Sequence, residues 1–155
     1  MLPKTHIILG AVLSLLIYLI FPEIGFLATA IIFLSSVLID VDHYLYYAIK
    51  TNNWSLKDAY RGFLKNTDSF RKLSKQEREE YSTAVIIFHG VECLIVLIIL
   101  VQFYSIFIWV LLGFFIHLIL DFIDMFRNKD SFYTKSSQLV VLYKNKSKKK
   151  ITHYT

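Results

Sequence analysis

The chain has 155 residues, of which 55% are hydrophobic, and a formal net charge of +5. Its mean hydropathy of +0.51 and its apolar fraction exceed those of ordinary soluble domains, in which about 45–50% of residues are apolar. The length suits one domain. The single cysteine, Cys93, excludes an internal disulfide and a structural zinc site built from several cysteines.

Four apolar stretches predict an all-α membrane protein. They cover about residues 5–21, 24–39, 84–104 and 106–126. A bilayer core of roughly 30 Å takes about 17–25 helical residues, so the last two stretches are long enough and the first two are marginal. The connections after the first and third stretches are very short, which predicts two antiparallel helical hairpins. We therefore expect a membrane domain of four transmembrane helices over residues 1–126.

The distribution of charge predicts the orientation of these hairpins. Of the 17 Lys and Arg residues, one is Lys4, eight lie in 44–83 and eight follow from Arg127 onward, whereas the opposite turns hold only Glu23. Short loops rich in Lys and Arg stay on the cytoplasmic side of a membrane. We expect a multi-pass protein of the cell membrane, with both termini and the insertion at 44–83 in the cytoplasm.

The cytoplasmic segments carry patterns of their own. Apolar residues from Trp54 to Leu64 recur at near-helical spacing, which predicts an amphipathic helix on the membrane surface. Ser74 and Glu77 match a capping box, which predicts a helix that runs on into the third stretch. Residues 127–155 read as a solvated basic tail that sets the orientation, and its lysines also favour anionic lipid head groups. Binding of nucleic acid is a weaker interpretation.

Side chains that bind metals gather at the cytoplasmic ends of all four stretches. Ionisable groups inside membrane segments are costly unless they are paired or ligated, so they mark a functional site by default. Nitrogen and oxygen ligands of this kind suit zinc, manganese or iron. The candidates, in chain order, are His6, Asp40, Asp42, His43, His89, Glu92, His117 and Asp121.

The spacing within the third and fourth stretches supports a common site. His117 and Asp121 are four residues apart and His89 and Glu92 are three apart, so each pair would share one face of a helix. A hydrogen-bonded pair that joins helices is the alternative for either pair. Six residues are the expected metal ligands: His6, Asp40, His43, His89, His117 and Asp121. Asp42 and Glu92 are expected to act as a ligand or as the catalytic general base.

These motifs resemble the YdjM-like family of inner-membrane metal-dependent hydrolases. The matching pieces are Thr5-His6, the segment from Leu38 to His43, the segment around His89, and His117 to Asp121. That family is distantly similar to zinc-dependent phospholipase C and P1-type nucleases, helical enzymes that hold several zinc ions through His, Asp and Glu. The resemblance implies phosphoester hydrolysis with a divalent metal, zinc first, in one to three copies.

Three functions are compatible with these patterns. The first is a membrane metallohydrolase that acts on a phosphoester, including a lipid, at the cytoplasmic leaflet. The second is a non-enzymatic membrane protein whose His and Asp cluster holds the helices together or recruits a partner. A metal transporter fits less well, because transporter sites usually lie near the middle of the bilayer.

Overall fold

A computed structural model of the chain describes residues 3–128, 130 and 136–148, and this part is built from helices. In chain order these are α1 (Pro3–Ile20), the 3-10 helix η1 (Pro22–Ile24), α2 (Gly25–Leu38), α3 (Val41–Thr51), α4 (Leu56–Lys72), α5 (Lys75–Glu80), α6 (Val91–Phe103), α7 (Phe107–Asn128) and α9 (Gln138–Asn145). The expected all-α class is confirmed.

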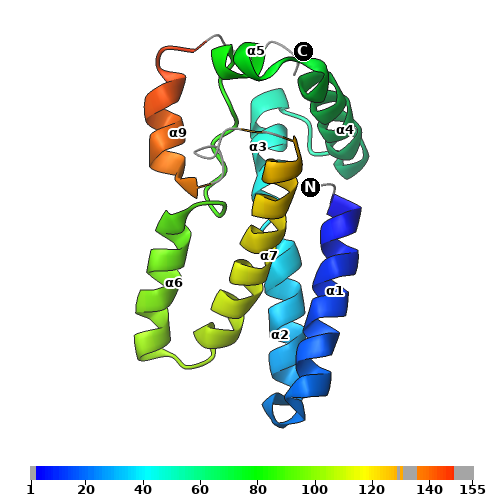
Figure 1. Ribbon diagram of the computed structural model, residues 1–155, viewed down its shortest axis with the longest axis vertical. Helices are drawn as coiled ribbons and strands as arrows, with labels where there is room; N and C mark the ends of the chain where they lie inside the picture. The colour runs from blue at the N-terminus through cyan, green and yellow to red at the C-terminus, as the bar shows by residue number, and fades with distance from the viewer. Residues whose placement is uncertain (1–2, 129, 131–135, 149–155) are drawn as a thin grey trace.

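Helices α1, α2 and α7 form a bundle, and α6 lies along the other side of α7 (Figure 1). Its core contains Ile32 of α2 with Ile116 and Leu120 of α7. Helices α2 and α7 approach closely at Gly113, where an added Cβ would overlap the Ser35 hydroxyl and the Ile32 carbonyl oxygen. This close approach brings α7, which carries His117 and Asp121, beside the helix that leads into Asp40.

Within the described residues, three helical segments are long and apolar enough to cross a membrane: Pro3–Ile20, Pro22–Thr51 and Phe107–Asn128. Their outward side chains include large apolar residues such as Leu19, Phe26 and Phe115, which are exposed. A soluble protein would bury such side chains, so these segments point to a helical membrane protein. Helix α6 is also apolar but has 13 residues, fewer than a full span requires.

The expected helix over 84–104 is wrong in its first part. Helix α6 begins only at Val91, with Gly90 at its N-cap position. The capping box of Ser74 and Glu77 is confirmed, but the helix that it starts, α5, ends at Glu80 and does not continue into α6. Side chains from α3 and α9 bond to the backbone of residues 82–90 in place of helical partners.

The second expected helix, over 24–39, is present as α2, Gly25–Leu38. After a short break at residues 39–40 the chain continues as α3 up to Thr51. Asp40, Asp42 and His43 therefore lie at a break between two helices and on the first turn of the second, rather than at the end of a helix.

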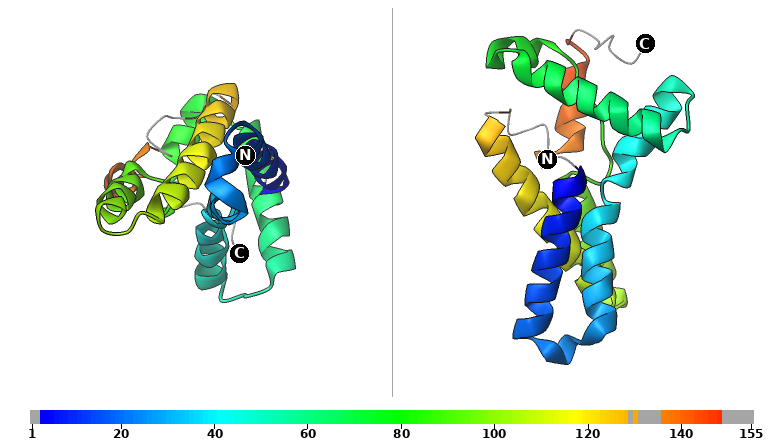
Figure 2. Two further views of the ribbon diagram at one scale, coloured as in Figure 1. Left: turned by 90° about the horizontal axis from the view of Figure 1, so that it is seen from below. Right: turned by 90° about the vertical axis from the view of Figure 1, so that its right-hand side faces the viewer.

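Helices α3, α4, α5 and α9 gather at the end of the bundle opposite η1, beside the start of α1 and the end of α7 (Figure 1). Figure 2 shows α4 crossing this end. The expected amphipathic helix is present as α4, which Ser55 caps by accepting from the backbone N–H of Asp58, and its location on the membrane surface stays a prediction. The insertion at 44–83 is thus partly helical, as expected.

The predicted tail at 127–155 is not wholly solvated. Helix α9 folds back toward the start of α6, where Val141 is fully buried and Gln138 is 5% exposed. Ser137 caps α9 by accepting from the backbone N–H of Val140. The last two lysines of the predicted basic cluster, at 149 and 150, lie outside the described residues.

Candidate metal centre

Side chains from four separate segments of the chain form one cluster near α4. The structure brings together seven of the eight candidate residues: His6, Asp40, Asp42, His43, His89, His117 and Asp121. His6 comes from α1, and His89 comes from the segment before α6. Asp40 lies at the α2–α3 break, and Asp42 and His43 lie on the first turn of α3. His117 and Asp121 come from α7. Five of the seven are buried, while Asp40 and His43 are half-buried.

The centre of this cluster is a meeting of two imidazole nitrogens and two carboxylate oxygens. Nε2 of His89 lies 3.1 Å from Nε2 of His117 and 3.2 Å from Oδ1 of Asp40. Oδ2 of Asp121 lies 3.7 Å from both nitrogens. Oδ1 of Asp40 lies 3.6 Å from Nε2 of His117. The four atoms therefore face one another across a space of metal-ligand dimensions.

The outer nitrogens determine how these two rings are protonated. Nδ1 of His117 lies 2.7 Å from the carbonyl oxygen of Ser36. A carbonyl only accepts, so Nδ1 carries the hydrogen and Nε2 of the neutral ring presents its lone pair to the centre. Nδ1 of His89 lies 3.2 Å from Oδ2 of Asp42 and donates to it in the same way. Such a donation orients a histidine that binds a metal through its other nitrogen.

The carboxylates around His89 favour its charged form. Burial lowers the pKa of its ring, but hydrogen bonds to Asp40 and Asp42 and the charge of Asp121 outweigh burial and raise the pKa to about 9. In the absence of a metal, the Nε2 hydrogen donates to Asp40. This one hydrogen cannot bridge all four converging atoms, whereas a divalent cation in its place would bind to all four at once.

His6 and His43 lie beside this centre. Nε2 of His6 lies 3.2 Å from Oδ1 of Asp121, and its ring stacks on that of His117 with centroids 4.2 Å apart. Its buried Nδ1 has no hydrogen-bond partner among the described residues. Nε2 of His43 lies 3.8 Å from Oδ1 of Asp40. Each ring therefore places its Nε2 close to a carboxylate of the cluster.

Among the described residues, these side chains form three overlapping sets whose ligand atoms lie within 4.8 Å of one another. The sets are His6, Asp40 and His117; Asp40, His43 and His89; and His89, His117 and Asp121. Each set offers a carboxylate and two imidazoles, a donor combination that suits borderline divalent cations. The residues present thus fit a metal ion.

The two expected catalytic residues have different surroundings. Asp42 is buried and accepts hydrogen bonds from His89 and from the backbone N–H of Phe88. Glu92 lies outside the cluster, because His89 precedes α6 and the two do not share a helical face. Its carboxylate instead accepts from the Ser137 hydroxyl and from the backbone N–H groups that open α9.

The sequence did not indicate the residues that hold the His89 segment in place. The side chain of Gln138 accepts from the backbone N–H of Ile86 at 2.9 Å and donates to the carbonyl of His89 at 3.3 Å. Further along α9, the amide of Asn145 bonds both the N–H and the carbonyl of Thr83. A lone Gln or Asn in a polar segment has no spacing that would mark it in advance.

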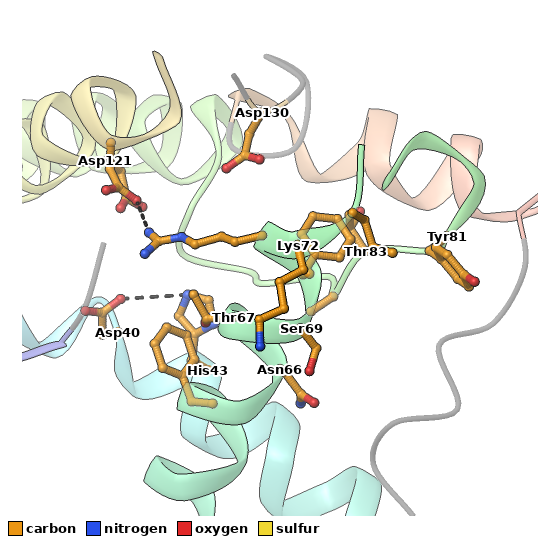
Figure 3. Close-up of a pocket in the computed structure, with 16 residues that line it drawn as sticks. Asp40, His43, Asn66, Thr67, Ser69, Lys72, Tyr81, Thr83, Asp121 and Asp130 are labelled. Atoms are coloured by element: carbon orange, nitrogen blue, oxygen red, sulfur yellow. Dashed lines mark hydrogen bonds and ion pairs between the residues drawn. The ribbon is translucent and has the colours of Figure 1, made fainter. Parts of the chain in front are cut away.

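A cavity of about 520 Å³ opens beside the cluster, between α4, the segment at 81–84 and the end of α7. Asp40, His43 and Asp121 belong to its wall, so the candidate metal centre borders this space. Figure 3 shows Asp40 and Asp121 on one side of the cavity and Tyr81 and Thr83 on the other. The volume is in the range of small-molecule sites.

Comparison with known proteins adds no relative from which a function could be carried over. No protein-family model, no curated protein and no solved structure matches this chain.

Proposed function

We propose that this chain is a membrane-embedded, metal-dependent hydrolase that acts on a phosphoester at the cytoplasmic face of the cell membrane. The observation that carries the proposal is the convergence of Nε2 of His89 and His117 with Oδ1 of Asp40 and Oδ2 of Asp121 beside a cavity. The resemblance of these motifs to the YdjM-like family supports the same reaction class.

The proposed ligands are His6, Asp40, His43, His89, His117 and Asp121. Zinc is the first candidate and manganese or iron the next, in one to three copies, because the ligand atoms are imidazole nitrogens and carboxylate oxygens. A bound divalent ion polarises a phosphoryl oxygen and lowers the pKa of water toward about 7.

Side chains of the protein are proposed to position a ligand and to accept a proton. Asp42 holds the His89 ring in the orientation that turns Nε2 to the centre, so its proposed role is positioning rather than proton transfer. Asp40 and His43 border the cavity, and the one of the two that does not bind the metal is placed to take a proton from an attacking water. Hydrolysis would break the bond between phosphorus and the leaving oxygen, which regains a proton, while water supplies the new P–O bond.

The proposed topology has four spans in two hairpins, α1 with α2–α3 and α6 with α7. The positive-inside rule supports a cytoplasmic location for the end that holds α4, α5 and α9, because the Lys and Arg residues of the chain lie there and after Arg127. With 13 residues, α6 measures about 20 Å at 1.5 Å per residue, so the fourth span requires a thinned bilayer or flanking residues within it.

Elemental analysis of detergent-purified protein tests the metal centre, with turnover of phosphoesters measured on the same sample. We expect bound divalent metal, and loss of both metal and turnover in Asp121→Asn, because the substitution removes a buried ligand charge. Glu23→Gln is the matched control, since Glu23 is an exposed carboxylate of η1 at the opposite end of the bundle. Full turnover in metal-free protein would contradict the proposal.

A structural metal site is the second candidate. The His6–Asp121 contact joins α1 to α7, and contacts of His89 join the segment before α6 to the α2–α3 break, so a bound ion would tie these pieces together. Metal that remains bound while no phosphoester is hydrolysed, with Asp121→Asn lowering only thermal stability, would favour this function over the first.

A further inference from the structure

The cavity beside the metal centre has a wall of mixed chemistry. Helix α4 contributes two phenyl rings, Phe63 and Phe70, and the cationic side chains of Arg71 and Lys72. The ring of Phe63 lies edge-on to His43 with centroids 5.7 Å apart. An apolar surface therefore begins directly beside a candidate ligand of the metal.

The charge of this wall depends on the metal. Four carboxylates line the cavity, those of Asp40, Asp121, Asp124 and Asp130, against two permanent cations. Without a metal, charged His89 pairs with Asp40 and Arg78 pairs with Asp130, so Arg71 and Lys72 face the charges of Asp121 and Asp124, and the wall has no excess positive charge to attract an anion. A divalent ion held by Asp40 and Asp121 would offset their charge and leave a wall that attracts one, so an anionic ligand and the metal should favour each other's binding.

Arg71 is the cation best placed to meet such an anion. Its Nη2 atom lies 3.4 Å from Oδ2 of Asp124, and its side chain is 41% exposed while that of Asp124 is 18% exposed. The contact is long for an ion pair with this planar donor group. Lys72 also lines the cavity, but its ammonium is 2.7 Å from Asp68 in a pair that is largely exposed.

We propose that this cavity binds a phosphate monoester with an apolar substituent, and that Arg71 exchanges Asp124 for the phosphate when the metal is present. The guanidinium matches two phosphate oxygens, the metal centre faces the phosphate from Asp40 and Asp121, and Phe63 packs against the substituent. This inference rests on the proposed metal-dependent function and adds the substrate class and the residue that selects it.

The test is a calorimetric titration of hexyl phosphate into the full-length protein in detergent, with and without Mn²⁺. We expect binding only in the presence of metal, and Arg71→Gln should weaken it by roughly tenfold or more, as expected for a lost charged hydrogen bond. Arg61→Gln is the matched control, because Arg61 is an exposed arginine of α4 outside the cavity wall. It should leave the affinity unchanged.

A second variant should act in the opposite direction. Asp124→Asn removes a negative charge from the wall and releases Arg71 from its ion pair, so hexyl phosphate should bind several-fold more tightly. Phe63→Ala should weaken hexyl phosphate but leave inorganic phosphate unchanged. Equal affinity of wild type and Arg71→Gln, or unchanged affinity in Asp124→Asn, would overturn the assignment of Arg71.

The outcomes separate this inference from the function on which it rests. Metal binding without metal-dependent binding of hexyl phosphate rejects the phosphate site and leaves the metal centre standing, whereas protein that binds no metal rejects both. Vesicles that contain phosphatidic acid distinguish the source of the ligand. Competition by these vesicles, with none by glycerol phosphate, assigns the site to a lipid head group, and the reverse result assigns it to a soluble phosphate monoester.

Discussion

The two histidines at the centre of the cluster are held by different kinds of partner. A backbone carbonyl fixes the tautomer of His117, whereas carboxylates on both nitrogens of His89 hold that ring in its charged form when no metal is present. A metal must therefore displace a proton from His89 but none from His117.

The raised pKa of His89 predicts that metal affinity increases with pH. The carboxylates raise the pKa of His89 to about 9. At pH values below this pKa, the ring carries an Nε2 proton that competes with the metal. Release of this one proton makes the affinity rise about tenfold per pH unit up to that pKa and then level off. Competition titrations with a chelator of known pH dependence, at pH 6.5, 7.5 and 8.5, measure this slope.

Asp42→Asn is the informative comparison. It keeps a hydrogen-bond acceptor for Nδ1 but removes a charge that raises the pKa of His89, so the pH dependence should level off at lower pH. An affinity that stays constant between pH 6.5 and 8.5 in the wild type would contradict the assigned protonation of His89.

Single residues also show what the sequence could reveal about the site. His117 and Asp121 lie one helical turn apart in a long apolar stretch, and this local spacing predicted their contact correctly. The carbonyl of Ser36 has no sequence signal, since every residue has one. The predicted partnership of His89 and Glu92 is wrong, because it assumed a helix where Gly90 begins one.

Among the elements, α9 has the least expected role. It holds the segment that carries His89 through the side chains of Gln138 and Asn145, and Glu92 fixes α9 in turn. A helix outside the predicted membrane domain therefore helps to hold the candidate metal centre in place.

Gln138→Ala should weaken metal binding by about tenfold, in line with other residues that orient a ligand without touching the metal. The substitution leaves the N–H of Ile86 and the carbonyl of His89 without this partner, so the position of the His89 ring relaxes. Competition titration measures the affinity. Leu142→Ala on the exposed side of α9 is the control, and equal effects of the two substitutions would contradict the role of Gln138.

The long helices were predictable because their signals are local. Apolar length defines α1, α2 and α7, Ser74 with Glu77 defines the start of α5, and the spacing of apolar residues defines α4. The segment between α5 and α6 was not predictable in the same way. Its conformation depends on acceptors and donors from Asp42, Gln138 and Asn145, which are about 46 to 62 residues away in the chain, and no local pattern reports such contacts.

At the scale of the whole molecule, the proposed orientation can be tested by labelling. With Cys93 replaced by Ala, we expect Glu23→Cys in the exposed turn at η1 to react with a membrane-impermeant maleimide in intact cells, and Lys146→Cys after α9 to react only after permeabilisation. Both positions are exposed, so access rather than burial decides the result. Labelling of Lys146→Cys alone in intact cells would reverse the orientation.

The position of α9 in the chain sets an order of events during synthesis. Every proposed metal ligand is translated before Gln138 and Asn145, so the membrane helices and their histidines exist for a time without the helix that positions His89. The centre reaches its final geometry only after α9 has left the ribosome and folded back. Metal binding at the proposed centre would therefore depend on synthesis having passed α9, and a product terminated before α9 that retains all seven clustered side chains should bind metal only weakly.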